Sequence, residues 1–412
     1  MEEIKKEIIE KVILVAVADQ DTTEAEESLD ELEELVKTAG AEVAARVIQV
    51  RETPHPGTYI GKGKIDEVNA LLYGTNATGI VCDDELSPAQ ISNLEEALDT
   101  KVMDRTLIIL DIFAKRAFTR EGKIQVELAQ LKYRASKLTG QGRALSRLGG
   151  GIGTRGPGEK KLEMDRRLIR TRISRLKAEL RDVVKHREVQ RKQRQKNHLP
   201  VVCIVGYTNA GKSTLLNHFT NAGVYEEDQL FATLDPTTKS LDLSGGQTIL
   251  MTDTVGFIRK LPHHLVEAFK STLEEAKYSD LILHVVDASN PQKEKQMEAV
   301  YDTLKQLGAN ESPTITAFNK IDLLNGDEIL KDPNAEAVVR ISGKNGEGTD
   351  QLLEQIEKIL QKQKLYLEKL YGYQEAGKIQ LIRSHGQLLK EEYRDDGIYV
   401  EAYIPKEILG SI

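Results

Sequence analysis

One stretch of the chain limits its possible folds more than any other. Residues 200–219, PVVCIVGYTNAGKSTLLNHF, read as an apolar strand, a loop and an amphipathic helix. The loop has the spacing Gly206-x-x-x-x-Gly211-Lys212-Ser213, in which the glycines let the backbone wrap closely around phosphate groups. Such a loop needs a strand before it and a helix N-terminus after it. The sequence therefore predicts an α/β domain with a phosphate-binding P-loop.

Two side chains of this loop are suited to a nucleoside triphosphate with its Mg²⁺. Lys212 can reach the β- and γ-phosphates, and the hydroxyl of Ser213 can bind Mg²⁺. We expect the whole loop to contact the nucleotide, which makes the candidate binding residues Gly206, Tyr207, Thr208, Asn209, Ala210, Gly211, Lys212 and Ser213.

A second motif selects the base. Residues 313–324, PTITAFNKIDLL, read as a strand that ends in Asn319, Lys320, Ile321 and Asp322. The carboxylate of Asp322 can accept hydrogen bonds from N1–H and the N2 amino group of guanine, a donor pair that adenine lacks. A charge-assisted hydrogen bond contributes about 1.5–3 kcal/mol, so the discrimination is strong.

A third motif follows the next strand. RISGKNG (340–346) contains Ser342, Gly343 and Lys344, which would bring backbone N–H groups near the guanine carbonyl. The three motifs, in this order and each after a strand, predict GTP as the substrate.

The segments between these motifs contain candidate switch loops. TILMTDTVGF (248–257) reads as a strand ending in Asp253, Thr254, Val255 and Gly256. We expect Asp253 to hold Mg²⁺ through water and the Gly256 N–H to bind the γ-phosphate.

Upstream, FATLDPTT (231–238) begins with Phe231, Ala232, Thr233, Leu234 and Asp235. Thr233 is the candidate second Mg²⁺ hydroxyl beside Ser213, with Thr237 and Thr238 as alternatives. The predicted catalytic groups are Lys212, Thr233 and Gly256.

The residue after Gly256 bears on the rate of hydrolysis. In the Ras pattern a Gln at this position orients the attacking water, whereas here it is Phe257, which cannot form a hydrogen bond through its side chain. Intrinsic hydrolysis should then be slow and should need a partner, a contribution that reaches about 10³–10⁵ in rate. The alternative is that Phe257 simply packs in the core.

The charge distribution points to an anionic partner. From Lys132 to Lys196 there are 21 Lys and Arg against 6 Asp and Glu, a local charge of +15 in a chain whose net charge is −8. Nucleic acid is the first candidate for the partner, and a solvated helical surface is the alternative.

The same region is predicted to form an antiparallel two-helix coiled coil. Its apolar stripes have heptad spacing along two arms of similar length, 105–138 and 162–196. The stripes consist of Ile124, Leu128, Leu131, Ala135 and Leu138, and of Leu162, Ile169, Ile173, Leu176, Leu180 and Val183. The glycine-rich stretch SRLGGGIGTRGPGEKK (146–161) would lie at the tip. Because a helix precedes it, it does not fit a second P-loop, and it is either an RNA contact or a disordered linker.

The length of 412 residues predicts several domains. We expect a small N-terminal α/β domain at 1–104, the basic hairpin at 105–198, the GTPase domain at 199–362 and a short C-terminal α/β domain at 363–412. In the first domain, strands are predicted at 12–18, 41–50, 78–83 and 101–104, and helices at 23–40 and 87–98. Cys82 and Cys203 each lie in an apolar run and read as buried small residues.

No apolar run approaches the ~20 residues needed to cross a bilayer, and the charged N-terminus does not resemble a secretory signal. We expect a cytoplasmic protein that does not insert stably into membranes and is a monomer.

With GYTNAGKS, FATLD, DTVGF and NKID in place and LSRLGGGIGTRGPGE on the hairpin, the chain resembles the HflX-type GTPases of the Obg-like superfamily. The resemblance spans nearly the whole chain, including PHPGTYIGKGKIDEV (54–68) and DDGIYVEAYIP (395–405). Two departures are Lys160, where Thr is expected, and SGK (342–344), where SAK is commoner.

The resemblance implies a factor that binds the large ribosomal subunit and splits stalled or idle ribosomes in its GTP-bound state. Hydrolysis stimulated by the large subunit would allow release. The arm would reach toward the peptidyl-transferase centre, where tip glycines 149–151, 153, 156 and 158 would permit close approach to RNA and Arg143, Arg147, Arg155, Lys160 and Lys161 would contact it. The alternatives are a GTPase that chaperones large-subunit assembly and a nucleotide-gated protein that silences ribosomes.

Overall fold

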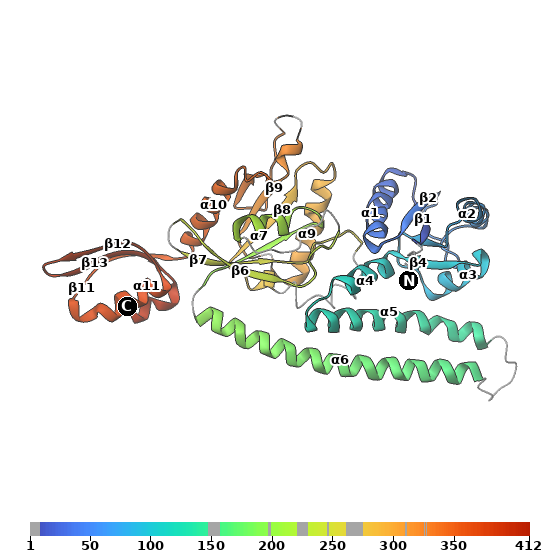
Figure 1. Ribbon diagram of the computed structural model, residues 1–412, viewed down its shortest axis with the longest axis horizontal. Coiled ribbons are helices and arrows are strands. Elements are labelled where there is room, and N and C mark those ends of the chain that lie inside the picture. The colour runs from blue at the N-terminus through green and yellow to red at the C-terminus, as the bar shows by residue number, and fades with distance from the viewer. Residues whose placement is uncertain are drawn as a thin grey trace, which may run out of the picture. The chain divides into compact units, whose positions relative to one another are not determined.

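The computed structural model describes residues 9–146, 157–196, 199–220, 230–244, 247–260, 275–309, 311–324, 326 and 328–412 (Figure 1). The chain divides into two compact units: Met1–Asp182 with Lys260–Ala268, and Val183–Arg259 with Phe269–Ile412. The predicted fold class is confirmed, since one unit contains a parallel α/β sheet with helices and the other a P-loop domain. The four domain limits taken from the sequence stay predictions.

The first unit is built on a four-stranded parallel sheet in the order β2-β1-β3-β4. Every strand expected in residues 1–104 is present, and Ser87 caps α3 through a capping box. The elements are β1 (Lys11–Ala18), α1 (Thr23–Ala39), β2 (Glu42–Val50), α2 (Lys62–Thr75), β3 (Gly79–Cys82), α3 (Pro88–Leu98), β4 (Lys101–Asp104), α4 (Arg105–Arg116), α5 (Arg120–Ser146) and α6 (Pro157–Lys196), of which the residues from Val183 on belong to the second unit.

The first arm of the hairpin is not the single helix from Arg105 that the apolar spacing suggested. The chain breaks between α4 and α5, where the Thr119 hydroxyl accepts a hydrogen bond from the Gly122 N–H and starts a new helix. Helix α4 buries Ile109, Leu110 and Phe113 within the first unit. The hairpin arm therefore starts at α5.

Helices α5 and α6 run antiparallel, as predicted. Pairs advance along one helix while they recede along the other: Arg120 with Glu179 at 2.6 Å, Glu127 with Arg172 at 2.7 Å, and the Leu138 carbonyl with Arg166 at 2.6 Å. The predicted stripe residues Ile124, Leu128 and Leu176 are buried. Residues 147–156, with most of the predicted tip, lie outside the described part of the chain, as do the side chains of Arg143, Lys160 and Lys161.

The second unit contains a six-stranded sheet in the order β10-β9-β8-β5-β7-β6, in which only β6 runs antiparallel to its neighbour. Its core gathers apolar residues of the central strands and of helices α7 and α10. The elements are β5 (Val201–Gly206), α7 (Lys212–Thr220), β6 (Thr237–Asp242), β7 (Thr248–Asp253), β8 (Leu281–Asp287), α9 (Lys293–Leu307), β9 (Thr314–Asn319), η1 (Ile321–Leu323), β10 (Ala337–Arg340) and α10 (Thr349–Lys362).

The C-terminal part of this unit is a three-stranded antiparallel sheet, β11-β13-β12, with one helix that buries Ile379 and Ile382 in the same small core. Its elements are β11 (Leu365–Tyr371), η2 (Tyr373–Glu375), α11 (Ala376–His385), β12 (Gln387–Arg394), β13 (Gly397–Ile404) and η3 (Lys406–Ser411).

Both cysteines are free and fully buried, as expected for small core residues. Among the helices that the structure describes, none combines the length and apolar character that crossing a membrane requires.

Candidate nucleotide-binding site

The P-loop follows β5 and leads into α7, the strand–loop–helix order that the sequence predicted. Two glycines are required by space. A Cβ atom on Gly206 would lie 2.2 Å from the Val285 carbonyl oxygen, and one on Gly211, whose φ is +92°, would lie 2.3 Å from Nδ2 of Asn319. Larger residues at either position would push the loop away from the strands that support it.

Lys212 is held at the inner side of the loop. Its Nζ donates hydrogen bonds to the carbonyl oxygens of Gly206 at 3.2 Å and Tyr207 at 2.7 Å. Burial lowers its pKa to about 8, although the carboxylate of Asp253 acts in the opposite direction. A polyphosphate bound in the loop would supply negative charge and favour the ammonium form.

Three candidate metal-binding side chains meet beside the loop. The hydroxyl of Ser213 lies 2.8 Å from the hydroxyl of Thr233 and 2.7 Å from Oδ2 of Asp253, to which it donates. The other Asp253 oxygen, Oδ1, is buried without a hydrogen-bond partner, and burial raises the pKa of this carboxyl group. Two hydroxyls and a carboxylate with an unsatisfied oxygen form a donor set that fits a hard divalent cation with bound water. Thr237 and Thr238, the alternatives to Thr233, lie instead in strand β6.

The segment after β7 lies against the P-loop. The N–H of Phe257 donates to the Gly206 carbonyl at 3.0 Å, and the N–H of Thr208 donates to the Phe257 carbonyl at 2.8 Å. A Cβ atom on Gly256 would lie 2.9 Å from Cα of Thr208 and 3.0 Å from Nζ of Lys212. Only glycine therefore lets the backbone come so close to the lysine ammonium. The side chain of Phe257 is buried.

The base-reading residues are connected to the P-loop through Asn319. Its Nδ2 donates to the Ala210 carbonyl at 2.9 Å, and its Oδ1 accepts from the N–H of Gly343 at 2.8 Å. Asp322 accepts a hydrogen bond of 2.6 Å from the Ser342 hydroxyl. One side chain thus links the phosphate loop to both segments predicted to surround guanine.

Some of the predicted site residues line one cleft, and others do not. A cleft is lined by P-loop residues, by Phe231, Ala232 and Thr233, and by Thr254 and Gly256. Leu234 and Val255 are buried apolar residues, while Lys344 is exposed. Lys320 pairs with Asp287 at 2.9 Å. The individual roles in nucleotide binding stay predictions.

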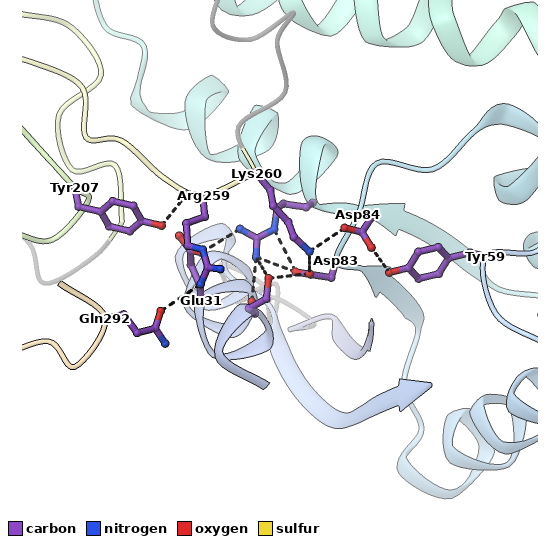
Figure 2. Close-up of polar contacts among 10 residues, drawn as sticks. Glu31, Tyr59, Asp83, Asp84, Tyr207, Arg259, Lys260 and Gln292 are labelled. Atoms are coloured by element: carbon purple, nitrogen blue, oxygen red, sulfur yellow. Dashed lines mark hydrogen bonds and ion pairs between the residues drawn. The ribbon is translucent and has the colours of Figure 1, made fainter. Parts of the chain in front are cut away.

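Sequence reasoning missed two features of this site. The Tyr207 hydroxyl accepts a hydrogen bond of 2.7 Å from the N–H of Arg259 (Figure 2), and the Thr254 hydroxyl donates to the Ile204 carbonyl at 2.7 Å. Both contacts fix the segment 254–259 against β5 and the P-loop. A motif gives residue types at fixed spacing and contains no signal for such cross-contacts.

Three family profiles match the chain in succession. They are described as GTP-binding GTPase N-terminal over residues 26–114, GTP-binding GTPase Middle Region over 116–194 and 50S ribosome-binding GTPase over 201–320.

Curated relatives match over almost the full length. The GTPase HflX of Lacrimispora saccharolytica is 68% identical over 99% of this chain and 96% of its own, and that of Caldanaerobacter subterraneus is 51% identical over 99% and 94%. Among solved structures, a GTP-binding protein from the archaeon Sulfolobus solfataricus in complex with GDP is 24% identical, covers 85% of this chain and 98% of its own, and gives a TM-score of 0.46.

Proposed function

Because this chain belongs to the HflX family of GTPases, we propose that it binds the large ribosomal subunit and splits ribosomes in its GTP-bound state, with hydrolysis used for release. Nucleotide binding in this proposal rests on one observation. The side chains of Ser213, Thr233 and Asp253 are hydrogen-bonded to one another next to the P-loop lysine. The matched description as a 50S ribosome-binding GTPase supports the choice of the large subunit.

In this proposal Mg²⁺ is the resident cation, held by Ser213 and Thr233 with Asp253 behind them, and it would neutralise charge on the β- and γ-phosphates. Lys212 adds positive charge from the loop side. The Gly256 N–H binds the γ-phosphate, and Asp322 selects guanine. Thr233 and Gly256 belong to the segments that contact the γ-phosphate and its cation. Because GDP lacks this phosphate, the positions of these segments would differ between the GTP-bound and GDP-bound states.

Hydrolysis in the free protein should be slow. The residue after Gly256 is Phe257, whose side chain is buried and cannot form a hydrogen bond, so it cannot orient the attacking water. Its backbone is hydrogen-bonded to the P-loop. We infer that the ribosome completes the catalytic arrangement.

The basic hairpin is the proposed RNA contact. Helix α6 carries exposed basic side chains along its length: Arg167, Arg170, Arg175, Lys177, Arg181 and Lys185. Such a run attracts RNA phosphates and gains affinity from counterion release. We also propose that the protein is cytoplasmic, because its proposed partner, the ribosome, is found there.

The test is GTP turnover with large subunits, small subunits or intact ribosomes added separately. We expect large subunits and intact ribosomes to raise the rate by at least about tenfold, and small subunits to leave it unchanged. A variant lacking residues 146–158 should keep GTP binding and lose ribosome splitting. In a further sample with precursors of the large subunit, stimulation that mature subunits do not produce would instead support a chaperone of assembly. Binding to ribosomes without stimulation would support silencing.

A further inference from the structure

The C-terminal sheet buries one face and exposes the other. Successive residues of a strand point to opposite faces, and helix α11 lies along one face of this sheet (Figure 1). The core shared with α11 takes alternate residues, such as Leu367 of β11 and Val400 and Ala402 of β13. The residues between them form the opposite face, which we call the outer face: Tyr366, Glu368, Leu370, Tyr399, Glu401 and Tyr403.

Tyrosine rings cover much of the outer face. Tyr366 and Tyr403 lie directly opposite each other on β11 and β13, with ring centroids 5.5 Å apart in an edge-to-face arrangement. The exposed fraction is 52% for Tyr366 and 39% for Leu370. Tyrosine gives a large contact area at a low cost in conformational entropy, and it is enriched at protein–protein interfaces. The outer face therefore has the composition of a surface that binds a protein.

Two carboxylates on the outer face lie directly opposite each other. Glu368 of β11 is in register with Glu401 of β13. The Tyr399 hydroxyl lies 2.7 Å from Oε1 of Glu368 and 2.9 Å from Oε1 of Glu401, but its single hydrogen can be donated to only one of them at a time. Like charges directly opposite each other destabilise a sheet. The two glutamates therefore reduce the stability of the C-terminal sheet.

The basic residues beside the outer face do not neutralise these two carboxylates. Lys390 of β12 lies opposite Glu401 but pairs with Glu392 at 2.7 Å. Arg394 pairs with Glu392 at 2.8 Å, and its guanidinium lies 3.9 Å from the centre of the Tyr399 ring. Among the residues that the structure describes, no lysine or arginine forms an ion pair with Glu368 or Glu401.

We propose that the outer face binds an arginine- or lysine-rich segment of a protein partner. A guanidinium or ammonium group between Glu368 and Glu401 would pair with both carboxylates and remove their repulsion. The rings of Tyr366 and Tyr403, next along the same face, would provide cation–π contacts of the kind that Arg394 already makes with Tyr399. RNA fits this face poorly, because the same carboxylates repel phosphate groups.

The proposed surface is separate from the nucleotide site. The inference goes beyond the proposed function, and it depends on neither GTP binding nor ribosome splitting.

The test measures binding of a fluorescein-labelled arginine-rich peptide to the full-length protein by fluorescence anisotropy. The double variant Glu368→Gln, Glu401→Gln should weaken binding about three- to tenfold, as expected for the loss of two exposed ion pairs. Tyr366→Leu should weaken it about two- to fivefold, because it removes a cation–π contact at an exposed site. The same peptide with citrulline at every arginine position keeps the size but loses the charge, and it should bind more weakly to the wild type.

The matched control is the double variant Glu294→Gln, Glu298→Gln, which removes the same charge from exposed residues of α9. It should leave the peptide affinity unchanged. Urea unfolding checks the fold of the variants. Because glutamine removes the repulsion across the strands, the Glu368→Gln, Glu401→Gln protein should unfold at the same urea concentration as the wild type or at a higher one.

Equal weakening by the two double variants would contradict the proposal, because it would indicate general attraction of the peptide to an acidic protein. Unchanged affinity in the Glu368→Gln, Glu401→Gln variant would also contradict it. Binding of a single-stranded oligouridine that Tyr366→Leu abolishes would identify a nucleic-acid surface instead. None of these measurements uses GTP or ribosomes, so a negative result would leave the proposed function unaffected.

Discussion

Asn319 donates to the carbonyl oxygen of Ala210 at 2.9 Å, so the base-reading segment and the P-loop share one hydrogen-bonded side chain. The same side chain accepts from Gly343. A residue whose motif is usually considered only for guanine specificity therefore also determines the spacing between the phosphate and base subsites.

Asn319→Ala should weaken GTP and GDP to the same extent. It removes two hydrogen bonds and leaves the buried Gly343 N–H without its acceptor, each loss being worth about 1–3 kcal/mol. We expect affinity for both nucleotides to fall by at least roughly 30-fold in equilibrium titrations, since the two losses together are at least about 2 kcal/mol. Selective loss of GTP alone would contradict the role assigned to Asn319, because both nucleotides carry the base and the β-phosphate.

Asp322→Asn should change base specificity with little effect on the fold. Asparagine can still accept the hydrogen bond from Ser342, so the loop should keep its position. It loses the charged acceptor for the guanine donors, and GTP affinity should fall about 10- to 100-fold while xanthosine triphosphate binding improves. Competition titrations with the two nucleotides measure this exchange, and a variant that retained strict guanine preference would contradict the base assignment.

The buried His284 should make the GTPase domain sensitive to mild acid. Burial lowers its pKa to about 4 from an ordinary 6.5, despite Asp332, whose Oδ2 lies 4.0 Å from Nδ1. Between pH 6.5 and pH 4, His284 is protonated in the unfolded chain but stays neutral in the folded one. The free energy of unfolding therefore decreases as the pH falls from 6.5 toward 4. The total effect is about 3 kcal/mol.

His284→Phe tests this origin directly. Phenylalanine keeps a ring against Tyr301, while Asp332 retains hydrogen bonds of 2.6 Å from Tyr301 and Thr316. Urea unfolding midpoints measured between pH 7 and pH 4 should fall less steeply for the variant than for the wild type. Parallel pH profiles would assign the sensitivity to other groups.

Removing positive charges from α6 should weaken ribosome binding and make the affinity less dependent on salt concentration. The triple change of Arg167, Arg170 and Arg175 to Gln removes three exposed charges. If each contacts RNA phosphate, the slope of log affinity against log salt should become shallower by about 2–3. Sedimentation with large subunits at several salt concentrations measures the slope.

The matched control for α6 replaces the exposed Lys305, Lys358 and Lys362 of the GTPase domain with Gln. It removes the same charge and should leave the slope unchanged. Equal effects of the two triple variants would indicate general charge attraction without a hairpin contact.

The motifs were predictable from the sequence because backbone geometry dictates their residues. Gly206 and Gly211 have no space for a Cβ atom, and strands with apolar runs precede each motif. Helix α2 was missed, since it buries only Val68 and Leu72 and so lacks a strong apolar period. The break before α5 depends on the single cap at Thr119.

Contacts between distant segments could not be predicted. Lys260 and Asp83 are 177 residues apart, and a lysine after a switch motif is ordinarily a solvated charge. Only the folded chain shows that Asp83 is already engaged by Arg105 and that its second oxygen faces Lys260. The pairing of Asn319 with Ala210 is of the same kind, because it depends on the meeting of β9 and the P-loop.

The most direct measurement of the central claim is light scattering from intact bacterial ribosomes mixed with this protein. One sample would contain a non-hydrolysable GTP analogue, and the other GDP. We predict that scattering falls with the analogue and stays constant with GDP, because splitting requires the γ-phosphate-bound state and not hydrolysis. Constant scattering with both nucleotides, while the protein binds large subunits, would contradict ribosome splitting.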